Sequence, residues 1–219
     1  MPAPWRCAVS DAKALLAAAR ALDAAGFMPS KSGNLSIRTP RGLLITPSGL
    51  PYAEAGVADL VELAVDGTTL AGQRRPSSEW RLHADIYAAR PDAQAIVHTH
   101  SPHATALSCA RRPIPALHYM IAFAGGDDIR CSGYATFGTA ELATEAVAAL
   151  VGRRACLLAN HGVVALGATL AGADTLAREV ENLARQYLLL LAAGLPPVLL
   201  DATEMEAVAA QFRGYGRPV

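Results

Sequence analysis

The stretch Ala95-Ile-Val-His-Thr-His-Ser-Pro102 joins a run typical of a buried strand to two histidines placed one residue apart. The apolar run predicts a strand over residues 95–99, and Pro102 suits the first turn of a short helix. Side chains alternate faces along a strand, so His98 and His100 are expected to point the same way. Two such rings can bind one ion, because Zn–N bonds are only about 2.1 Å long. Alone, this spacing favours a structural role over a metal site.

Helix and strand patterns continue on both sides of this stretch. Predicted helices cover residues 11–25, 76–90, 140–151 and 169–193, with shorter ones starting near 102 and 203; predicted strands cover 35–37, 42–46, 60–65, 95–99, 155–159 and 163–166. The first strands follow one another too closely for the crossover helices that parallel pairing requires. No linker, charge block or repeat divides the chain. We therefore expect an α/β fold with residues 1–219 in a single domain: a central, mainly antiparallel sheet flanked by helices on both faces.

Composition narrows the class of partner. Of the 219 residues, 52% are hydrophobic and 17% charged, and 19 basic side chains balance 19 acidic ones. A neutral chain without a basic stripe is not expected to bind nucleic acid. No apolar stretch is long enough to span a membrane, and the first residues lack the pattern of a signal peptide. Four scattered cysteines suit a reducing compartment, so we expect a cytoplasmic protein.

Two further side chains suited to metal binding or proton transfer stand at the ends of predicted elements. His161 follows the strand 155–159 and precedes Gly162, where another backbone can approach closely. Glu79 lies at the start of the helix 76–90. Its carboxylate either interacts with the helix dipole, worth roughly 0.3–1 kcal/mol, or takes part in a site, and the local sequence leaves both readings open.

The other three histidines are expected to lie outside the set of metal ligands. His83 follows Glu79 by one helical turn and is expected to support the site or to pack in the core. His103 lies beyond Pro102 and is expected to face away from His98 and His100. For His118, an orienting role and a structural role both stay open.

Seven motifs in one order resemble class II (zinc-dependent) sugar-phosphate aldolases, especially the L-fuculose-1-phosphate aldolases of the aldolase/epimerase superfamily. The resemblance extends over nearly the whole chain. The motifs are Ser32-Gly-Asn-Leu-Ser36, Leu44-Ile-Thr-Pro-Ser-Gly49, Pro76-Ser-Ser-Glu-Trp-Arg81, Val97-His-Thr-His100, Ile114-Pro-Ala-Leu-His-Tyr-Met120, Tyr134-Ala-Thr-Phe-Gly138 and Asn160-His-Gly162.

The resemblance implies a role for each motif. His98, His100 and His161 would be the imidazole ligands of Zn²⁺, with Co²⁺ or Mn²⁺ also compatible. Glu79 would be the catalytic acid/base and would ligate the metal when substrate is absent. The substrate phosphate would lie against Gly33, Asn34, Ser48, Gly49, Ser77 and Ser78. Tyr119 and Tyr215 would reach the site of a neighbouring subunit in a homotetramer, with Tyr119 as proton donor to the departing aldehyde.

The implied reaction cleaves a 2-ketose 1-phosphate, such as L-fuculose 1-phosphate or a related deoxy-ketose 1-phosphate, into dihydroxyacetone phosphate and a small aldehyde. Such chemistry needs an electron sink for a carbanion, which a metal can supply. Lys13 and Lys31 are the only lysines, and neither has the setting of a Schiff-base amine. Proton transfer by Glu79 is expected to need a raised pKa. Lys31 stands where related motifs carry a small hydroxyl residue.

Three other functions stay open at this point. Methylthioribulose-1-phosphate dehydratases share the glutamate and the Ser-Gly-Asn-Leu-Ser pattern. Pentulose-phosphate 4-epimerases typically carry aspartate at the position of Glu79, which argues against that branch. A non-catalytic binding or scaffold domain would not need three histidines and a glutamate together.

Overall fold

Seven antiparallel strands form one sheet in this computed structural model, which describes residues 9–214. The order across the sheet is β4-β3-β2-β1-β5-β7-β6. The strands are β1 (Asn34–Thr39), β2 (Gly42–Ile45), β3 (Val61–Leu63), β4 (Thr69–Ala71), β5 (Ala95–Thr99), β6 (Ala155–Leu158) and β7 (Gly162–Gly167). The opening stretch thus supplies β5, an interior strand between β1 and β7, and all five of its strand residues are buried.

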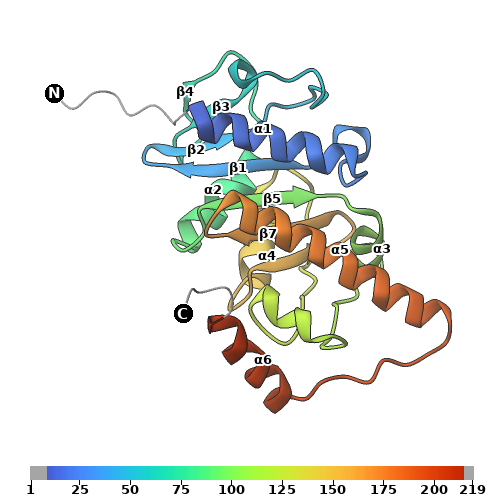
Figure 1. Cartoon of the computed structure of the whole chain (residues 1–219). Helices are drawn as coiled ribbons and strands as arrows, with labels where there is room; N and C mark the ends of the chain where they lie inside the picture. Colours follow the sequence, from blue (N-terminus) through green and yellow to red (C-terminus); the bar gives the residue numbers. More distant parts are fainter. Residues whose placement is uncertain (1–8, 215–219) are drawn as a thin grey trace.

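Helices cover both faces of this sheet (Figure 1). The helices are α1 (Val9–Ala24), α2 (Trp80–Ala89), α3 (Pro102–Cys109), α4 (Ala140–Ala149), α5 (Leu170–Ala192) and α6 (Ala202–Gly214), with 3-10 turns η1 (Pro29–Lys31), η2 (Val57–Asp59) and η3 (Tyr119–Ala124). One core lies beneath α1, α3 and α5, and a second core lies beneath α2 and α4. Each fully buried aliphatic side chain contributes about 1.5–3 kcal/mol, so the two cores together hold the layers in place.

Strand alternation decides which polar side chains meet α2. In β5, Ala95 and Val97 pack beneath α5, whereas Ile96 packs beneath α2 and α4. His98 follows Ile96 by two positions and therefore faces α2. In β1, Leu35 packs in the first core, which leaves Asn34 and Ser36 on the face of α2.

The predicted fold class is confirmed, and two local predictions need correction. The short edge strand β4 was not predicted, because Thr69–Ala71 has neither length nor a clear apolar alternation. Helix α2 begins at Trp80 rather than at Pro76, and Glu79 occupies its N-cap position. Within residues 9–214, no helix combines the length and apolarity needed to span a membrane.

Candidate metal centre and substrate cavity

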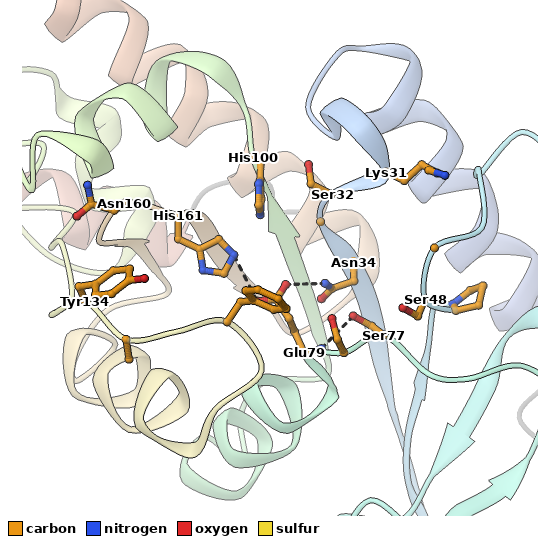
Figure 2. A pocket seen from close by; sticks show the side chains of 16 residues that line it. Lys31, Ser32, Asn34, Ser48, Ser77, Glu79, His100, Tyr134, Asn160 and His161 are labelled. Atoms are coloured by element: carbon orange, nitrogen blue, oxygen red, sulfur yellow. Dashed lines mark hydrogen bonds and ion pairs between the residues drawn. The ribbon is translucent and has the colours of Figure 1, made fainter.

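Four side chains from three parts of the chain converge at one edge of the sheet. His98 lies near the end of β5, His100 directly after it, His161 in the turn between β6 and β7, and Glu79 at the start of α2. One potential ligand atom from each residue lies within 4.8 Å of all the others. Figure 2 shows His100, His161 and Glu79 pointing toward one another at the floor of a cavity.

The three imidazoles lie close together, and each can offer a nitrogen atom to a shared metal ion. Their centroids lie 4.9, 4.9 and 4.8 Å apart, and every pair is close to perpendicular. His98 Nδ1 lies 2.8 Å from the carbonyl oxygen of Val163, to which it donates. In the neutral ring this bond leaves Nε2 unprotonated and directed at the cluster, which is how metal-binding histidines are usually oriented.

Glu79 completes the cluster with a carboxylate that does not cap its own helix. Its N-cap position shows no side-chain capping bond; instead Oε2 lies 3.1 Å from His98 Nε2, and Oε1 lies 3.3 Å from His161 Nε2. Oε1 is buried, and among the described residues it accepts no hydrogen bond. A buried acceptor without a hydrogen-bond donor, beside three imidazoles, fits a divalent transition metal in a nitrogen and oxygen site.

The pKa values of the cluster follow from burial and mutual charge. Burial and the charge of His98 lower the pKa of His100 to about 3, and the same two causes lower that of His161 to about 4. Both rings are therefore neutral at pH 7 and offer lone pairs to a metal. Burial also acts to lower the pKa of His98, but the carboxylate of Glu79 outweighs it and raises the pKa.

The expectation of a raised pKa for Glu79 is wrong, because the side chains around Glu79 lower its pKa. Burial does act to raise the pKa of Glu79, but His98 and His161 outweigh burial and hold the pKa below its usual range. A hydrogen bond from Asn34 acts in the same direction. The group is therefore ionised at neutral pH, which is the form that accepts a proton.

Close backbone approach explains the glycines beside the cluster. A Cβ on Gly33 would lie 2.7 Å from the carbonyl oxygen of His98, and its φ of +81° is one that other residues rarely adopt. A Cβ on Gly162 would overlap the carbonyl oxygen of Thr99 and would lie 3.0 Å from His100 Cδ2. Only a residue without a side chain fits at either position.

We expect Gly162→Ala to destabilise the fold by about 1–3 kcal/mol, because an added methyl group must displace Thr99 or the ring of His100. Zinc affinity should fall as well, since His100 moves. Urea unfolding of the metal-free protein and zinc titration measure the two effects. Gly56→Ala is the matched control, because its Cβ would make only a 3.6 Å contact with Asp59. Equal stability and zinc affinity in both variants would contradict the expectation.

A cavity of about 290 Å³ opens above the cluster. In Figure 2, Lys31, Ser32, Ser48 and Ser77 lie on one side of the cluster, and Tyr134 and Asn160 lie on the other. The lining residues are Lys31, Ser32, Gly33, Asn34, Pro47, Ser48, Gly49, Ser77, Ser78, Glu79, His100, Tyr134, Ala135, Phe137, Asn160 and His161. All six residues that the resemblance assigned to the phosphate therefore line one cavity.

Hydrogen bonds within the protein already use part of this lining. The backbone N–H of Ser48 donates to Arg75, and that of Ser77 donates to Thr46. The side-chain amide of Asn34 bonds Glu79 Oε2 at 3.0 Å. Ser77 Oγ accepts from the backbone N–H of Glu79 at 3.3 Å, so its own proton is free for a ligand. The serine hydroxyls, more than these backbone groups, are the donors that face the cavity.

Of the two predicted tyrosines, only Tyr119 lies within the described residues, and it does not line this cavity. Tyr119 is 51% exposed and stacks on Phe212, with ring centroids 6.4 Å apart, in a second cavity between η3 and α6. Tyr215 lies outside the described residues. Tyr134 and Phe137 do line the cavity, and their only sequence signal was membership in the motif Tyr134-Ala-Thr-Phe-Gly138.

The three remaining histidines lie outside the cluster. His83 is fully buried and contacts Asn34 and Ser36, so it supports the site from the core. His103 faces away, and its Nδ1 lies 2.6 Å from Glu181 Oε1. His118 accepts a hydrogen bond from the backbone N–H of Met120 and caps η3.

Asn160 was predicted only as a member of the motif Asn160-His-Gly162, without a role of its own, yet it shapes the turn that carries His161. Its φ is 55°, in the left-handed region that asparagine tolerates better than most residues. Its side chain accepts from Arg111 Nε at 3.0 Å and donates to the carbonyl oxygen of Cys109 at 3.3 Å. These bonds hold the turn against the end of α3.

Comparison with known proteins identifies the family. Residues 13–188 match the family model described as Class II Aldolase and Adducin N-terminal domain. The 5-methylthioribulose-1-phosphate/5-deoxyribulose-1-phosphate aldolase of Rhodospirillum rubrum is 54% identical over 92% of this chain and 90% of its own. The L-fuculose phosphate aldolase of Escherichia coli O6:H1 is 47% identical over 87% of this chain and 88% of its own. A solved structure of L-fuculose 1-phosphate aldolase superimposes with a TM-score of 0.91 and 41% identity, covering 94% of this chain and 98% of that one. The chain therefore belongs to the class II aldolases, a family of metal-dependent enzymes.

Proposed function

We propose that this aldolase cleaves a deoxy-ketose 1-phosphate between its third and fourth carbons, releasing dihydroxyacetone phosphate and a small aldehyde. The observation that carries the proposal is one carboxylate and three imidazoles beneath a cavity whose two ends differ in chemistry. One end is rich in hydroxyl groups and the other carries aromatic rings, which suits a substrate with a phosphate at one end and an apolar group at the other.

The hydroxyl-rich end is assigned to the phosphate. Ser48, Ser77 and Ser78 line it together with Gly33 and Gly49. Ser77 and Ser78 lie just before the first turn of α2, where the helix dipole favours an anion. Lys31 lines the same end and adds a positive charge. The local groups therefore suit a phosphate although the chain as a whole is neutral.

The cluster is assigned to the reacting carbons. His98, His100 and His161 would hold Zn²⁺, with Co²⁺ or Mn²⁺ as alternatives, and Glu79 would complete the set when no substrate is bound. A metal held there supplies a Lewis acid that stabilises the negative charge developing during cleavage. Glu79 lies at the base of the cavity as an ionised carboxylate. In the condensation direction it would remove a proton from the hydroxymethyl carbon of dihydroxyacetone phosphate, and in cleavage it would return that proton.

The aromatic end is assigned to the aldehyde portion of the substrate. Tyr134 and Phe137 are 57% and 64% exposed, and both line the cavity. Rings with this exposure suit a deoxygenated or thioether terminus better than a row of hydroxyl groups. The 54% identity to an aldolase named for 5-methylthioribulose 1-phosphate and 5-deoxyribulose 1-phosphate favours these pentulose phosphates over L-fuculose 1-phosphate.

The proposal extends to the assembly and location of the enzyme. Tyr119 lies away from Glu79 within one subunit and would serve a neighbouring subunit of a homotetramer, as would Tyr215. Tyr119 would give a proton to the oxygen of the departing aldehyde. A reducing cytoplasm agrees with the free thiols of Cys109, Cys131 and Cys156.

A panel of phosphorylated ketoses tests this function. We expect release of dihydroxyacetone phosphate from 5-deoxyribulose 1-phosphate and 5-methylthioribulose 1-phosphate with kcat/KM at least about tenfold above that for L-fuculose 1-phosphate. The two pentulose phosphates would place a methyl or methylthio group against the rings, where L-fuculose 1-phosphate would place an additional hydroxyl-bearing carbon, a difference worth about 1–3 kcal/mol. The coupled reduction of dihydroxyacetone phosphate measures each rate. Inversion at the fourth carbon of a pentulose 5-phosphate without carbon–carbon cleavage would replace the proposal with an epimerase, and loss of water without such cleavage would replace it with a dehydratase.

A further inference from the structure

A line of buried hydrogen bonds leads from Glu79 into the core. Asn34 Nδ2 lies 3.0 Å from Glu79 Oε2, and Asn34 Oδ1 lies 2.5 Å from His83 Nε2. Beyond the ring, His83 Nδ1 lies 2.7 Å from Ser36 Oγ, which in turn lies 2.9 Å from the hydroxyl of Tyr87. His83 and Ser36 are fully buried, and Asn34 and Tyr87 are 4% and 2% exposed.

Two periodicities place these residues in line. Glu79, His83 and Tyr87 are spaced by four and share one side at the start and along the length of α2. Asn34 and Ser36 are spaced by two and share the face of β1 that meets α2. Residues from α2 and from β1 therefore alternate along the line of hydrogen bonds.

The chemistry of the groups allows one arrangement of protons. The ionised carboxylate of Glu79 only accepts, so Asn34 must present its N–H to it and its oxygen to His83. His83 Nε2 must then carry a proton, because an amide oxygen cannot donate. Burial and the charge of His98 lower the pKa of His83 to about 3, so the ring is neutral and its Nδ1 is an acceptor. Ser36 donates to Nδ1 and accepts from Tyr87, whose pKa is raised by burial and which stays protonated.

We propose that His83 is a positioning residue for aldol cleavage: its Nε2–H holds the amide of Asn34 with the N–H toward Glu79, and thereby sets the orientation of the Glu79 carboxylate. The alternative amide orientation would direct the oxygen of Asn34 at the carboxylate and its N–H at a ring N–H. Each of those contacts is repulsive in a buried site. This role rests on the proposed function, since it acts through the group that would move the proton.

The protonation state of His83 is tested on the metal-free wild-type protein. The ¹⁵N chemical shifts of the two ring nitrogens are expected to show a protonated Nε2 and an unprotonated Nδ1 at pH 7. An imidazolium, or the tautomer protonated at Nδ1, would overturn the proposal whether or not the enzyme cleaves any sugar phosphate.

Kinetics of three variants test the effect on Glu79. We expect His83→Leu to lower kcat about 10–100-fold while KM changes less than about threefold, as is typical when a group that orients a catalytic residue is lost. His83→Gln should restore kcat to within about threefold of wild type, because its amide N–H can reach Asn34 from a similar position. Leu82→Ala is the matched control, a buried apolar neighbour in α2 whose loss destabilises the helix without touching this line.

The outcomes separate positioning from packing. A His83→Leu variant as active as Leu82→Ala, or a His83→Gln variant as slow as His83→Leu, would overturn the proposal. If His83→Leu does not fold, the ¹⁵N shifts of wild type and the kinetics of His83→Gln still test whether His83 has a positioning role. An inactive wild-type enzyme with a protonated Nε2 would instead count against the proposed function and leave the hydrogen-bond arrangement standing.

Discussion

Glutamine in place of Glu79 is expected to lower kcat for aldol cleavage about 10³-fold, within the 10²–10⁴-fold range of general acid–base groups, while the protein keeps its metal. Glutamine has the same shape but cannot take up and return a proton. It can still accept the hydrogen bond that Asn34 donates over 3.0 Å. The three imidazoles are untouched, so bound metal measured by atomic emission should stay near one ion per subunit.

The control for Glu79→Gln is Glu62→Gln, which removes another buried carboxylate. Glu62 accepts from Thr39 at 3.1 Å and pairs with Arg41, and none of these three residues lines the cavity. We expect this variant to lose stability and to keep kcat. A Glu79→Gln enzyme with more than a tenth of wild-type turnover would remove Glu79 from its proposed role.

Alanine in place of His98 is expected to weaken metal binding by more than about 100-fold, because losing a ligand costs more than the 10–100-fold typical of groups that only orient one. His98 is fully buried, lies 3.1 Å from Glu79 Oε2 and donates to Val163. Its removal leaves the buried carboxylate of Glu79 without its nearest imidazole. Adding zinc should raise the melting temperature of the chelated wild-type protein and leave that of the variant unchanged.

A second histidine from the same segment serves as the control for His98→Ala. His103 bonds Glu181 rather than the cluster, so His103→Ala should keep zinc and regain turnover when metal is returned after chelation. Chelated wild-type enzyme should show the same activity loss as His98→Ala. Returning the metal should restore the wild type and His103→Ala but not His98→Ala. Recovery of turnover by His98→Ala would mean that the metal lies elsewhere.

The sequence identified the members of the candidate site better than it identified their contacts. His98 and His100 could be placed on one face because strand alternation is a local property, and His98 in β5 and His100 directly after it do lie in one cluster. Asn34 was assigned to the phosphate and lines the cavity, and its side chain also bonds Glu79 and His83. That assignment could not be refined locally, because the two partners lie 45 and 49 residues away in the sequence.

The pKa of Glu79 shows the same limit. The need for proton transfer led to the prediction of a raised pKa, and nothing in the local sequence indicated that neighbouring charges would lower it. The direction of the shift depends on two opposing effects: burial, which raises the pKa, and the charges of His98 and His161, which lower it. Both effects depend on distances that strand pairing sets, namely Asn34 opposite His98 and His98 opposite Val164.

By itself the sequence determined the periodic features of this protein: the buried central strand, the two-residue spacing of His98 and His100, and the four-residue spacing of Glu79, His83 and Tyr87. These are properties of backbone geometry and need no distant partner. Only the tertiary structure determined which of these regularly spaced residues contact one another. Hydrogen-bond direction and charge are properties of pairs of atoms brought together from distant segments, and each pairing in this site depends on the register of the sheet against α2.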